Sequence, residues 1–325
     1  MELYRISRYD LTHCGEAVRK VAAETGRSVA YHRWDFLTSV VRYGVGPRQY
    51  AAGGFYALPA FVRKDTYTRR RRDRLCKALN DKAYQHLLKN KEEFNAAFAP
   101  YIGRAWMHCG GASAEAIADF IARNRRVIVK PCDSEKGHGI YFLDAGTPAA
   151  TEAATKLAGT DTLLEERLTQ HPQMCFGNQS VNTLRINTVV DRDGAVHVVS
   201  SALRCGVGEA PVDNFSGGGV VYPLSNTMGR ITGPGKSLQS GGCLYVHPQT
   251  DFFMPGRAIP FWNEALDLVK AAAKVVPQIR LVGWDVAILE SGPVLIEGNT
   301  KPGETLMECR GEGEKGVYRT ILSLV

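Results

Sequence analysis

The feature that most restricts the fold is a pair of apolar segments near the carboxyl end that are joined by a short polar turn. The segments are Leu281–Leu289 and Pro293–Glu297, and residues 290–292 (Glu-Ser-Gly) separate them. Both are rich in Val, Ile and Leu, which favours strands, and so short a connection joins antiparallel neighbours. The two segments therefore predict a β-ribbon near the carboxyl end.

The register of this ribbon decides whether its polar residues meet. A three-residue loop with Gly292 in a left-handed conformation places Asp285 opposite Glu297 and Gly283 opposite Asn299. Because strand side chains alternate with a period of two, Asp285, Glu297 and Asn299 then share one face. A two-residue loop would send the two acids to opposite faces, so the register tests the prediction.

Two carboxylates facing each other among apolar residues repel each other and are costly to bury. A divalent cation resolves both problems. Oxygen ligands from Asp285, Glu297 and Asn299, without His or Cys, suit Mg²⁺ or Mn²⁺, which can bridge the β- and γ-phosphates of a nucleotide. The alternative is a hairpin whose acids are solvated on an open face.

The rest of the chain predicts an α+β protein with an amino-terminal region of unclear role (1–78), a small lobe (79–168) and a large lobe (169–325). Residues 1–78 mix short helical stretches with a Gly- and aromatic-rich segment. The small lobe contains a helix capped by Ser113 and a helix at Thr147–Leu157, with strands at Val127–Val129, Ile140–Leu143 and Thr162–Glu165. The large lobe adds strands at Thr183–Val190 and Ala195–Leu203 and a helix at Pro260–Val276.

Composition restricts the partners. The net charge of +7 and the pI near 9.0 favour anionic ligands. Much of this charge lies in Lys64 and the arginines of residues 69–74, which we interpret as a solvated helix face or loop, since no recognition motif indicates a nucleic-acid or membrane patch.

No apolar run suits a transmembrane segment or a signal peptide, and the eight cysteines are scattered, which favours the cytoplasm and reduced thiols. The oligomeric state stays open.

A phosphate-binding stretch is suggested near the end of an apolar strand. Lys130 ends that strand and is followed by a turn containing Lys136, Gly137, His138 and Gly139. A lysine can present its ammonium to a phosphate, and glycines let backbone N–H groups approach phosphate oxygens. The alternative is a turn without a ligand.

Two further groups are weaker signals. Glu165 and Glu166, followed by Leu168, end the last strand of the small lobe and could face adenine and ribose, or be solvated acids at a strand end. Arg185 and Arg204 lie on the two strands of a hairpin, where guanidinium groups suit phosphate or carboxylate, although either alone is more often a surface residue.

The order of these stretches resembles the ATP-grasp superfamily, and within it the sugar-transfer-associated branch, over about residues 79 to 310. The resemblance rests on the strand with Lys130, the Gly-rich turn, the Glu-Glu hinge, the Arg hairpin, Gly-Trp-Asp at 283–285 and Glu-x-Asn-Thr-x-Pro-Gly at 297–303. It implies two α+β lobes that sandwich ATP, preceded by an irregular, mostly helical region.

The resemblance also implies a role for each residue. Lys82 and Lys130 would hold the α- and β-phosphates, with the turn from Lys136 to Gly139 over the triphosphate and with Glu165, Glu166 and Leu168 around adenine and ribose. Asp285, Glu297 and Asn299 would bind magnesium, Arg185 and Arg204 would stabilise the acyl phosphate and tetrahedral intermediate, and Asn214, Lys301 and Gly303 would lie near the substrate.

The function implied by this resemblance is an ATP-dependent carboxylate–amine ligase that works through an acyl phosphate and releases ADP and phosphate. The branch name suggests small-molecule substrates of polysaccharide or specialised-metabolite pathways, by analogy alone. The alternatives are a phosphotransferase that acts on a small-molecule hydroxyl and a nucleotide-binding regulator without turnover.

Overall fold

The computed structural model describes residues 8–132, 139–208, 218–237, 243–309, 311 and 316–325. The helices are α1 (Arg8–Thr25), α2 (Val29–Tyr43), α3 (Pro47–Ala51), α4 (Ala60–Arg63), α5 (Arg69–Leu79), α6 (His86–Lys89), α7 (Lys91–Ala97), α8 (Ala99–Ile102), α9 (Ala114–Asn124), α10 (Pro148–Leu157), α11 (Trp262–Ala273), α12 (Glu304–Met307) and α13 (Tyr318–Leu324). Short 3-10 turns are η1 (Phe55–Ala57), η2 (Lys82–Tyr84) and η3 (Pro172–Met174).

The strands form two antiparallel sheets. A four-stranded sheet in the order β1-β4-β2-β3 consists of β1 (Trp106–His108), β2 (Arg126–Pro131), β3 (Tyr141–Asp144) and β4 (Thr162–Glu166). A six-stranded sheet in the order β10-β9-β5-β6-β7-β8 consists of β5 (Thr183–Val190), β6 (Val196–Cys205), β7 (Val220–Leu224), β8 (Lys236–Ser237), β9 (Leu281–Leu289) and β10 (Gly292–Asn299).

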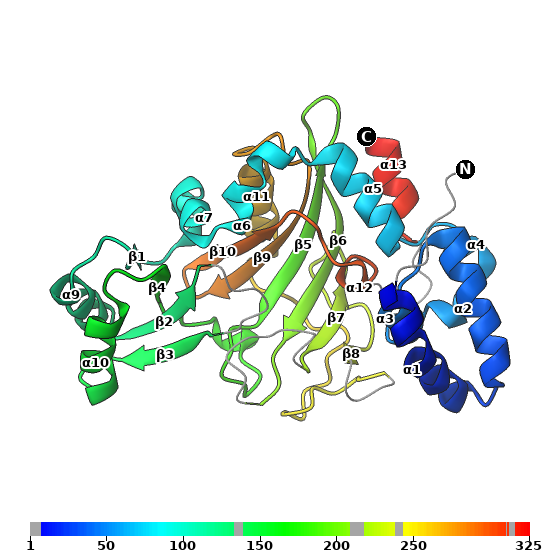
Figure 1. Cartoon of the computed structure of the whole chain (residues 1–325), viewed down its shortest axis with the longest axis horizontal. Coiled ribbons are helices and arrows are strands. Elements are labelled where there is room, and N and C mark those ends of the chain that lie inside the picture. Colours follow the sequence, from blue (N-terminus) through cyan, green and yellow to red (C-terminus); the bar gives the residue numbers. More distant parts are fainter. Residues whose placement is uncertain (1–7, 133–138, 209–217, 238–242, 310, 312–315) are drawn as a thin grey trace.

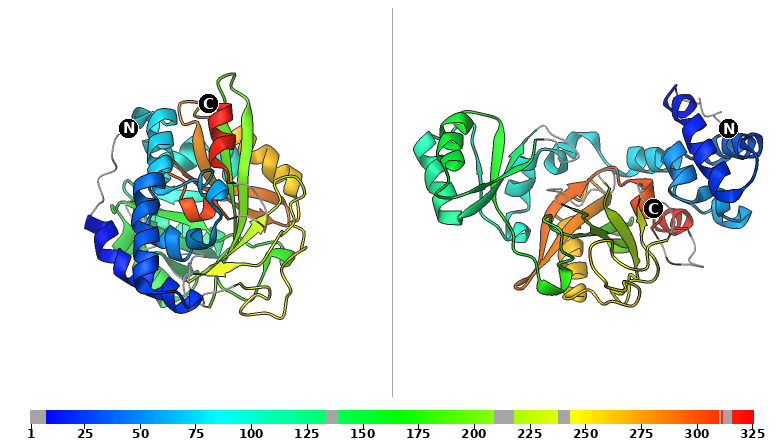
Figure 2. Two further views of the ribbon diagram at one scale, coloured as in Figure 1. Left: turned by 90° about the vertical axis from the view of Figure 1, so that its right-hand side faces the viewer. Right: turned by 90° about the horizontal axis from the view of Figure 1, so that it is seen from below.

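The chain forms three bodies in a row. The four-stranded sheet with α9 and α10 lies at one end, the six-stranded sheet lies in the middle, and α1 to α4 lie at the other end (Figures 1 and 2). Helices α6, α7 and α8 run along β10, the edge strand that faces the smaller sheet. The α+β class is confirmed.

The terminal ribbon, formed by β9 and β10, has the predicted pairing of Asp285 with Glu297 but a different turn. Gly292 pairs with Leu289, so the turn has two residues and the three-residue loop is wrong. The register then shifts between Leu295 and Glu297, where Ile296 is an extra residue. Because of this bulge, Glu297 lies opposite Asp285, as predicted.

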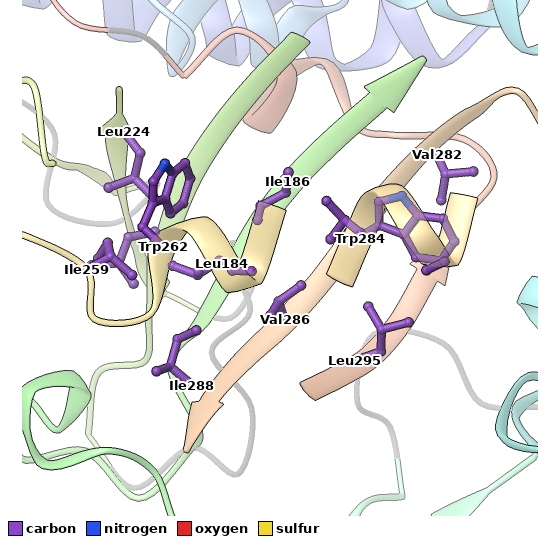
Figure 3. Packing of buried hydrophobic residues seen from close by; sticks show 14 of the residues in the cluster. Leu184, Ile186, Leu224, Ile259, Trp262, Val282, Trp284, Val286, Ile288 and Leu295 are labelled. Carbon is purple, nitrogen blue, oxygen red and sulfur yellow. The ribbon is translucent and has the colours of Figure 1, made fainter. Parts of the chain in front are cut away.

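The apolar face of the larger sheet packs against α11. Leu184 and Ile186 of β5 and Trp284 and Val286 of β9 point to this helix, which contributes Trp262 (Figure 3). Trp284 is buried, and its Nε1 donates to Thr188 Oγ1 over 2.9 Å. Since successive side chains alternate, the opposite face of β5 and β9 carries Arg185 and Asp285.

The smaller sheet follows the local sequence pattern. Ser113 and Thr147 accept hydrogen bonds from Ala116 N and Ala150 N and cap α9 and α10, as predicted for Ser113. Both helices pack on Val127 and Val129 of β2, which leaves Ile128 and Lys130 on the opposite face.

The amino-terminal region is more regular than predicted. Two long helices, α1 and α2, replace the expected short stretches and have their own core, which includes Val21, Phe36, Val40 and Tyr50.

The interpretation of the arginine run as a solvated face is wrong for at least three of its members. Arg70 donates to the carbonyls of Val41 and Arg42 at the end of α2, where the helix dipole favours a cation. Arg71 donates to Thr66 O, and Arg72 forms an ion pair of 2.6 Å with Glu304. These arginines therefore hold α5 against neighbouring segments.

No helix among the described residues is long and apolar enough to cross a bilayer.

Replacing Trp284 with Ala tests the core. Loss of a large buried ring is expected to lower the free energy of unfolding by about 3–5 kcal/mol. Chemical denaturation measures this change. The matched control is Trp34→Ala, because Trp34 is 72% exposed and its removal is expected to change stability by about 0.5 kcal/mol or less. Equal effects of the two substitutions would contradict the assignment of this core.

Candidate active site

A buried group of charges lies on the polar face of the larger sheet. Arg185 on β5 pairs directly with Asp285 on β9, and Arg204 on β6 lies diagonally across from them, opposite Thr183. All three charged residues are at least nine-tenths buried. The alternative in which the arginines are surface strand residues is therefore wrong.

Asp285 is held between the two arginines. Arg185 donates from Nε to Oδ1 and from Nη2 to Oδ2, the latter over 3.0 Å, and Arg204 Nη1 donates to Oδ2. Burial alone would raise the pKa of Asp285, but the positive charges of Arg185 and Arg204 hold it well below its ordinary value. Asp285 is therefore ionised.

Glu297 differs from Asp285 because it faces solvent. Its side chain is exposed, although protein atoms crowd around the carboxyl group. This crowding and the adjacent negative charge of Asp285 raise the pKa of Glu297, and a hydrogen bond links the two carboxyl groups. Because water reaches the side chain, we attribute the raised pKa of Glu297 mainly to the charge of Asp285. Asn299 Nδ2 lies 3.3 Å from Glu297 Oε1.

These residues fit a divalent cation. A cation bound between the adjacent carboxyl groups of Asp285 and Glu297 would offset the repulsion that raises the pKa of Glu297. A carboxylate offers about four lone-pair directions, of which the arginines use three on Asp285. The fourth direction faces the carboxyl group of Glu297, so a cation bound between the two residues would replace the hydrogen bond that now links them. An oxygen-only donor set completed by the amide of Asn299 suits Mg²⁺.

Two residues fix the ribbon in place. A Cβ on Gly283 would lie 2.8 Å from Asn187 Oδ1 and 3.3 Å from Pro302 Cβ, so only glycine allows this close packing. Asn80, which follows α5, donates to the carbonyls of Leu281 and Thr300 over 2.8 and 2.7 Å. It therefore bonds the start of β9 to the residue that follows β10.

On the smaller sheet, Lys130 forms an ion pair with Glu165. Arg104 Nη2 and Asn95 Nδ2 bond the other oxygen of this carboxylate over 2.9 and 2.8 Å. Burial alone would raise the pKa of Glu165, but Arg104 and Lys130 hold it well below its ordinary value. The alternative of a solvated strand-end acid is wrong for Glu165.

Lys91 also lies in this neighbourhood, although no sequence motif indicated it. Its Nζ donates to the carbonyls of Pro131 and Cys132 over 2.9 and 3.0 Å, at the end of the strand that carries Lys130. Burial lowers the pKa of Lys91, and charges that act on it include Glu297, Lys130 and Glu165. Charged residues of both sheets therefore act on Lys91.

The other predicted nucleotide residues are more dispersed. Lys82 is exposed in η2. Glu166 Oε2 accepts from Ala105 N over 3.1 Å, and Leu168 packs beside Ala287 and Leu289. Gly139 has φ +72°, and a Cβ there would lie 3.1 Å from Pro131, so glycine is required.

Two of the three predicted substrate residues, Lys301 and Gly303, lie near α5 and α12. Lys301 is largely exposed and forms an ion pair of 2.9 Å with Asp73, and Gly303 precedes α12. Lys136, Gly137, His138 and Asn214 lie outside the described residues.

The chain is similar in sequence to one described protein family and in fold to several solved structures. The family model for sugar-transfer associated ATP-grasp proteins matches residues 70–321, whereas no curated protein sequence matches the chain. Among solved structures, the ATP-grasp ligase PsnB, complexed with a phosphomimetic variant of its minimal precursor, Mg and ADP, is 13% identical with a TM-score of 0.47, and the match covers 76% of this chain and 60% of that chain.

Two further structures are similar. D-cycloserine synthetase DcsG is 14% identical with a TM-score of 0.46, and the match covers 79% of each chain. D-alanyl-alanine synthetase A from Vibrio cholerae O1 biovar eltor is 12% identical with a TM-score of 0.40, and the match covers 73% of this chain and 60% of that chain. The chain thus spans less than two thirds of the length of PsnB and of the alanine synthetase.

The acid stability of the protein tests the charge state of Asp285. The pKa of Asp285 is lower in the folded protein than in the unfolded chain, where it is about 4. Its contribution to stability is therefore fully present above about pH 4 and is lost as the pH falls through the lower pKa of the folded protein. Breaking a buried pair costs about 3–5 kcal/mol. Asp285→Asn is therefore expected to be less stable than the wild type near neutral pH, and the difference is expected to shrink below about pH 4.

Denaturation at several pH values measures this difference. Asp144→Asn, which removes one partner of an exposed pair with Arg126, is the control and is expected to change little. A difference between wild type and Asp285→Asn that grows on acidification would contradict the assignment.

Proposed function

Because this chain belongs to the sugar-transfer associated ATP-grasp family, we propose that it is an ATP-dependent ligase that joins a carboxylate to an amine. The observation that carries the proposal is the convergence of Asp285, Glu297 and Asn299 on one face of the terminal ribbon. Lys91 bonds the carbonyls of Pro131 and Cys132, next to Lys130 on the smaller sheet, and the charge of Glu297 also acts on it. Metal ligands on one lobe and a lysine for phosphate on the other suit a nucleoside triphosphate bound between the lobes.

In the proposed reaction, a carboxylate oxygen of the acid attacks the γ-phosphorus of ATP and the bond to the β-phosphate oxygen breaks. The products are ADP and an acyl phosphate. The amine then attacks the acyl carbon, phosphate leaves with the former carboxylate oxygen, and the amine loses a proton. An amide and inorganic phosphate result.

The nucleotide is assigned to the space between the sheets. Lys130, with Lys82 and the turn of residues 136–139, would contact the phosphates, while Glu166 and Leu168 would lie near adenine and ribose. Glu165 would act through Lys130, because its carboxylate already bonds Lys130, Arg104 and Asn95. Excluding water here protects the acyl phosphate from hydrolysis.

Asp285, Glu297 and Asn299 would hold Mg²⁺ or Mn²⁺, which when bound neutralises phosphate charge. Arg185 and Arg204 lie beside this group. A guanidinium has five N–H donors, and the contacts of Arg185 with Asp285 use two of them. We assign these arginines to the oxyanion of the tetrahedral intermediate.

The substrates are assigned to the end of the site near α12. Gly303 and Lys301 lie there, and Asn214 completes the set of candidate substrate residues. By analogy with the family description, the acid and the amine would be small molecules of polysaccharide or specialised-metabolite biosynthesis.

The metal assignment is tested by Glu297→Gln. Loss of a charged ligand is expected to reduce the enhancement of ADP binding by Mg²⁺ at least about tenfold, since even outer-shell partners of a metal contribute roughly 10–100-fold. Titration calorimetry with and without Mg²⁺ measures the enhancement. Glu290→Gln, at the exposed turn of the same ribbon, is the matched control. An unchanged enhancement in Glu297→Gln would exclude Glu297 as a ligand.

The reaction class is tested by screening carboxylate and amine pairs for ADP release with isotopically labelled carboxylate oxygen. A ligase transfers one labelled oxygen into the released phosphate, whereas a phosphotransferase acting on a hydroxyl does not. Asp285→Asn is the inactive control. ADP release without label in phosphate would refute the ligase, and ADP release that no candidate substrate raises would favour a regulator.

A further inference from the structure

Arg104, between α8 and β1, connects the two sheets. Its side chain is 1% exposed. Nη2 donates to Glu165 Oε1 over 2.9 Å, and Nη1 donates to the carbonyl of Leu295 over 2.6 Å. Nη2 also lies 3.3 Å from the carbonyl of Ile296. One guanidinium therefore bonds the partner of Lys130 and the bulge that directs Glu297 to the site.

The second contact lies where β10 needs support. β10 is an edge strand, so its outer carbonyls have no neighbouring strand, and a bulge disturbs the ladder further. Arg104 donates to both residues at the register shift, Leu295 and Ile296. The position of Glu165 is thereby fixed relative to the strand that carries Glu297.

The first contact decides how much charge Lys130 can offer. Glu165 gives one oxygen to Arg104 and the other to Lys130, so the three bonded groups carry one negative and two positive charges. Lys130 is the most exposed of the three, with 14% of its side chain accessible against 4% for Glu165. The surplus positive charge is therefore presented at Lys130. Without Arg104, Lys130 and Glu165 would form a neutral pair, which attracts a phosphate less strongly.

We propose that Arg104 is a positioning residue for the nucleotide, because it neutralises Glu165 and so leaves the charge of Lys130 available to a phosphate. This inference rests on the proposed function, which makes Lys130 a phosphate ligand. Lys91 lies nearby, but its ammonium bonds two backbone carbonyls and is the same in all variants considered below.

A purely structural role for Arg104 predicts a different outcome when Glu165 is changed as well. If Arg104 only supports the fold, then also replacing Glu165 removes further hydrogen bonds and gives no recovery of nucleotide binding. If Arg104 acts by neutralising Glu165, then replacing Glu165 with the isosteric neutral Gln releases Lys130 again. Rescue by a second substitution therefore separates the two roles.

The experiment measures the dissociation constant of ADP without Mg²⁺ by titration calorimetry, so that the metal ligands do not contribute. Arg104→Met is expected to weaken ADP binding at least about tenfold, the size of one charge-assisted contact. Arg104→Met combined with Glu165→Gln is expected to recover affinity to within about threefold of the wild type, because one positive charge remains at Lys130 in both proteins. Arg126→Met is the control, since Arg126 lies on β2 with its side chain 66% exposed.

Wild-type affinity in Arg104→Met, or a double variant that binds no better than Arg104→Met, would overturn the proposal. If Arg104→Met alone does not fold, the double variant replaces the buried charged pair by neutral groups and is expected to fold better. A folded double variant that binds ADP tenfold more weakly than the wild type would then contradict the proposal. Lys130→Met tests the nucleotide site separately from the role of Arg104. If this substitution leaves ADP binding unchanged, the proposed nucleotide site is wrong, and so is the role of Arg104.

Discussion

The site depends on one extra residue in an edge strand. Leu295 packs in the core beneath the larger sheet, and Glu297 has to lie on the opposite face, next to Asp285. In an uninterrupted ladder closed by the observed two-residue turn, Glu297 would face Trp284 on the apolar side, where an uncompensated charge is costly. Ile296 absorbs the difference. The bulge therefore allows the same short strand to complete the core and to supply a polar site.

Each of the two buried carboxylates is bonded to two cationic side chains, so each group keeps a net positive charge. Asp285 lies between Arg185 and Arg204, and Glu165 lies between Arg104 and Lys130. Each carboxylate is thus compensated by two cations. This arrangement satisfies buried hydrogen-bonding groups and leaves positive charge for an anion, in accord with the net charge of +7. Glu297 is the exception, since it faces solvent and has an acid as its neighbour, which is the condition under which a divalent cation binds.

The local sequence pattern predicted those parts of the fold that short-range rules determine. The cap at Ser113 and the strand β5 follow from capping residues and apolar runs, and the facing of Asp285 and Glu297 was also predicted. That facing was right although the loop length was wrong, because two errors of one residue cancelled: the shorter turn and the unforeseen bulge at Ile296. A bulge without a glycine leaves no signal in the pattern.

Long-range contacts explain what was missed. Arg104 contacts residues 61 and 191 positions away along the chain, and nothing in its local sequence distinguishes it from a surface arginine. Lys91 likewise acts on Pro131, 40 residues away. The arginine run was misinterpreted for the same reason, since the acid that pairs with Arg72 is Glu304, 232 residues away. Short strands such as β1 and β8 depend on their neighbours and were not predicted.

The most direct test of this account is a crystal structure of the protein with ADP and Mg²⁺. A cation is expected at about 2.0–2.1 Å from oxygens of Asp285, Glu297 and Asn299, and Lys130 Nζ is expected within about 3 Å of a phosphate oxygen. A nucleotide bound away from the terminal ribbon, or a cation coordinated by none of these three side chains, would contradict it.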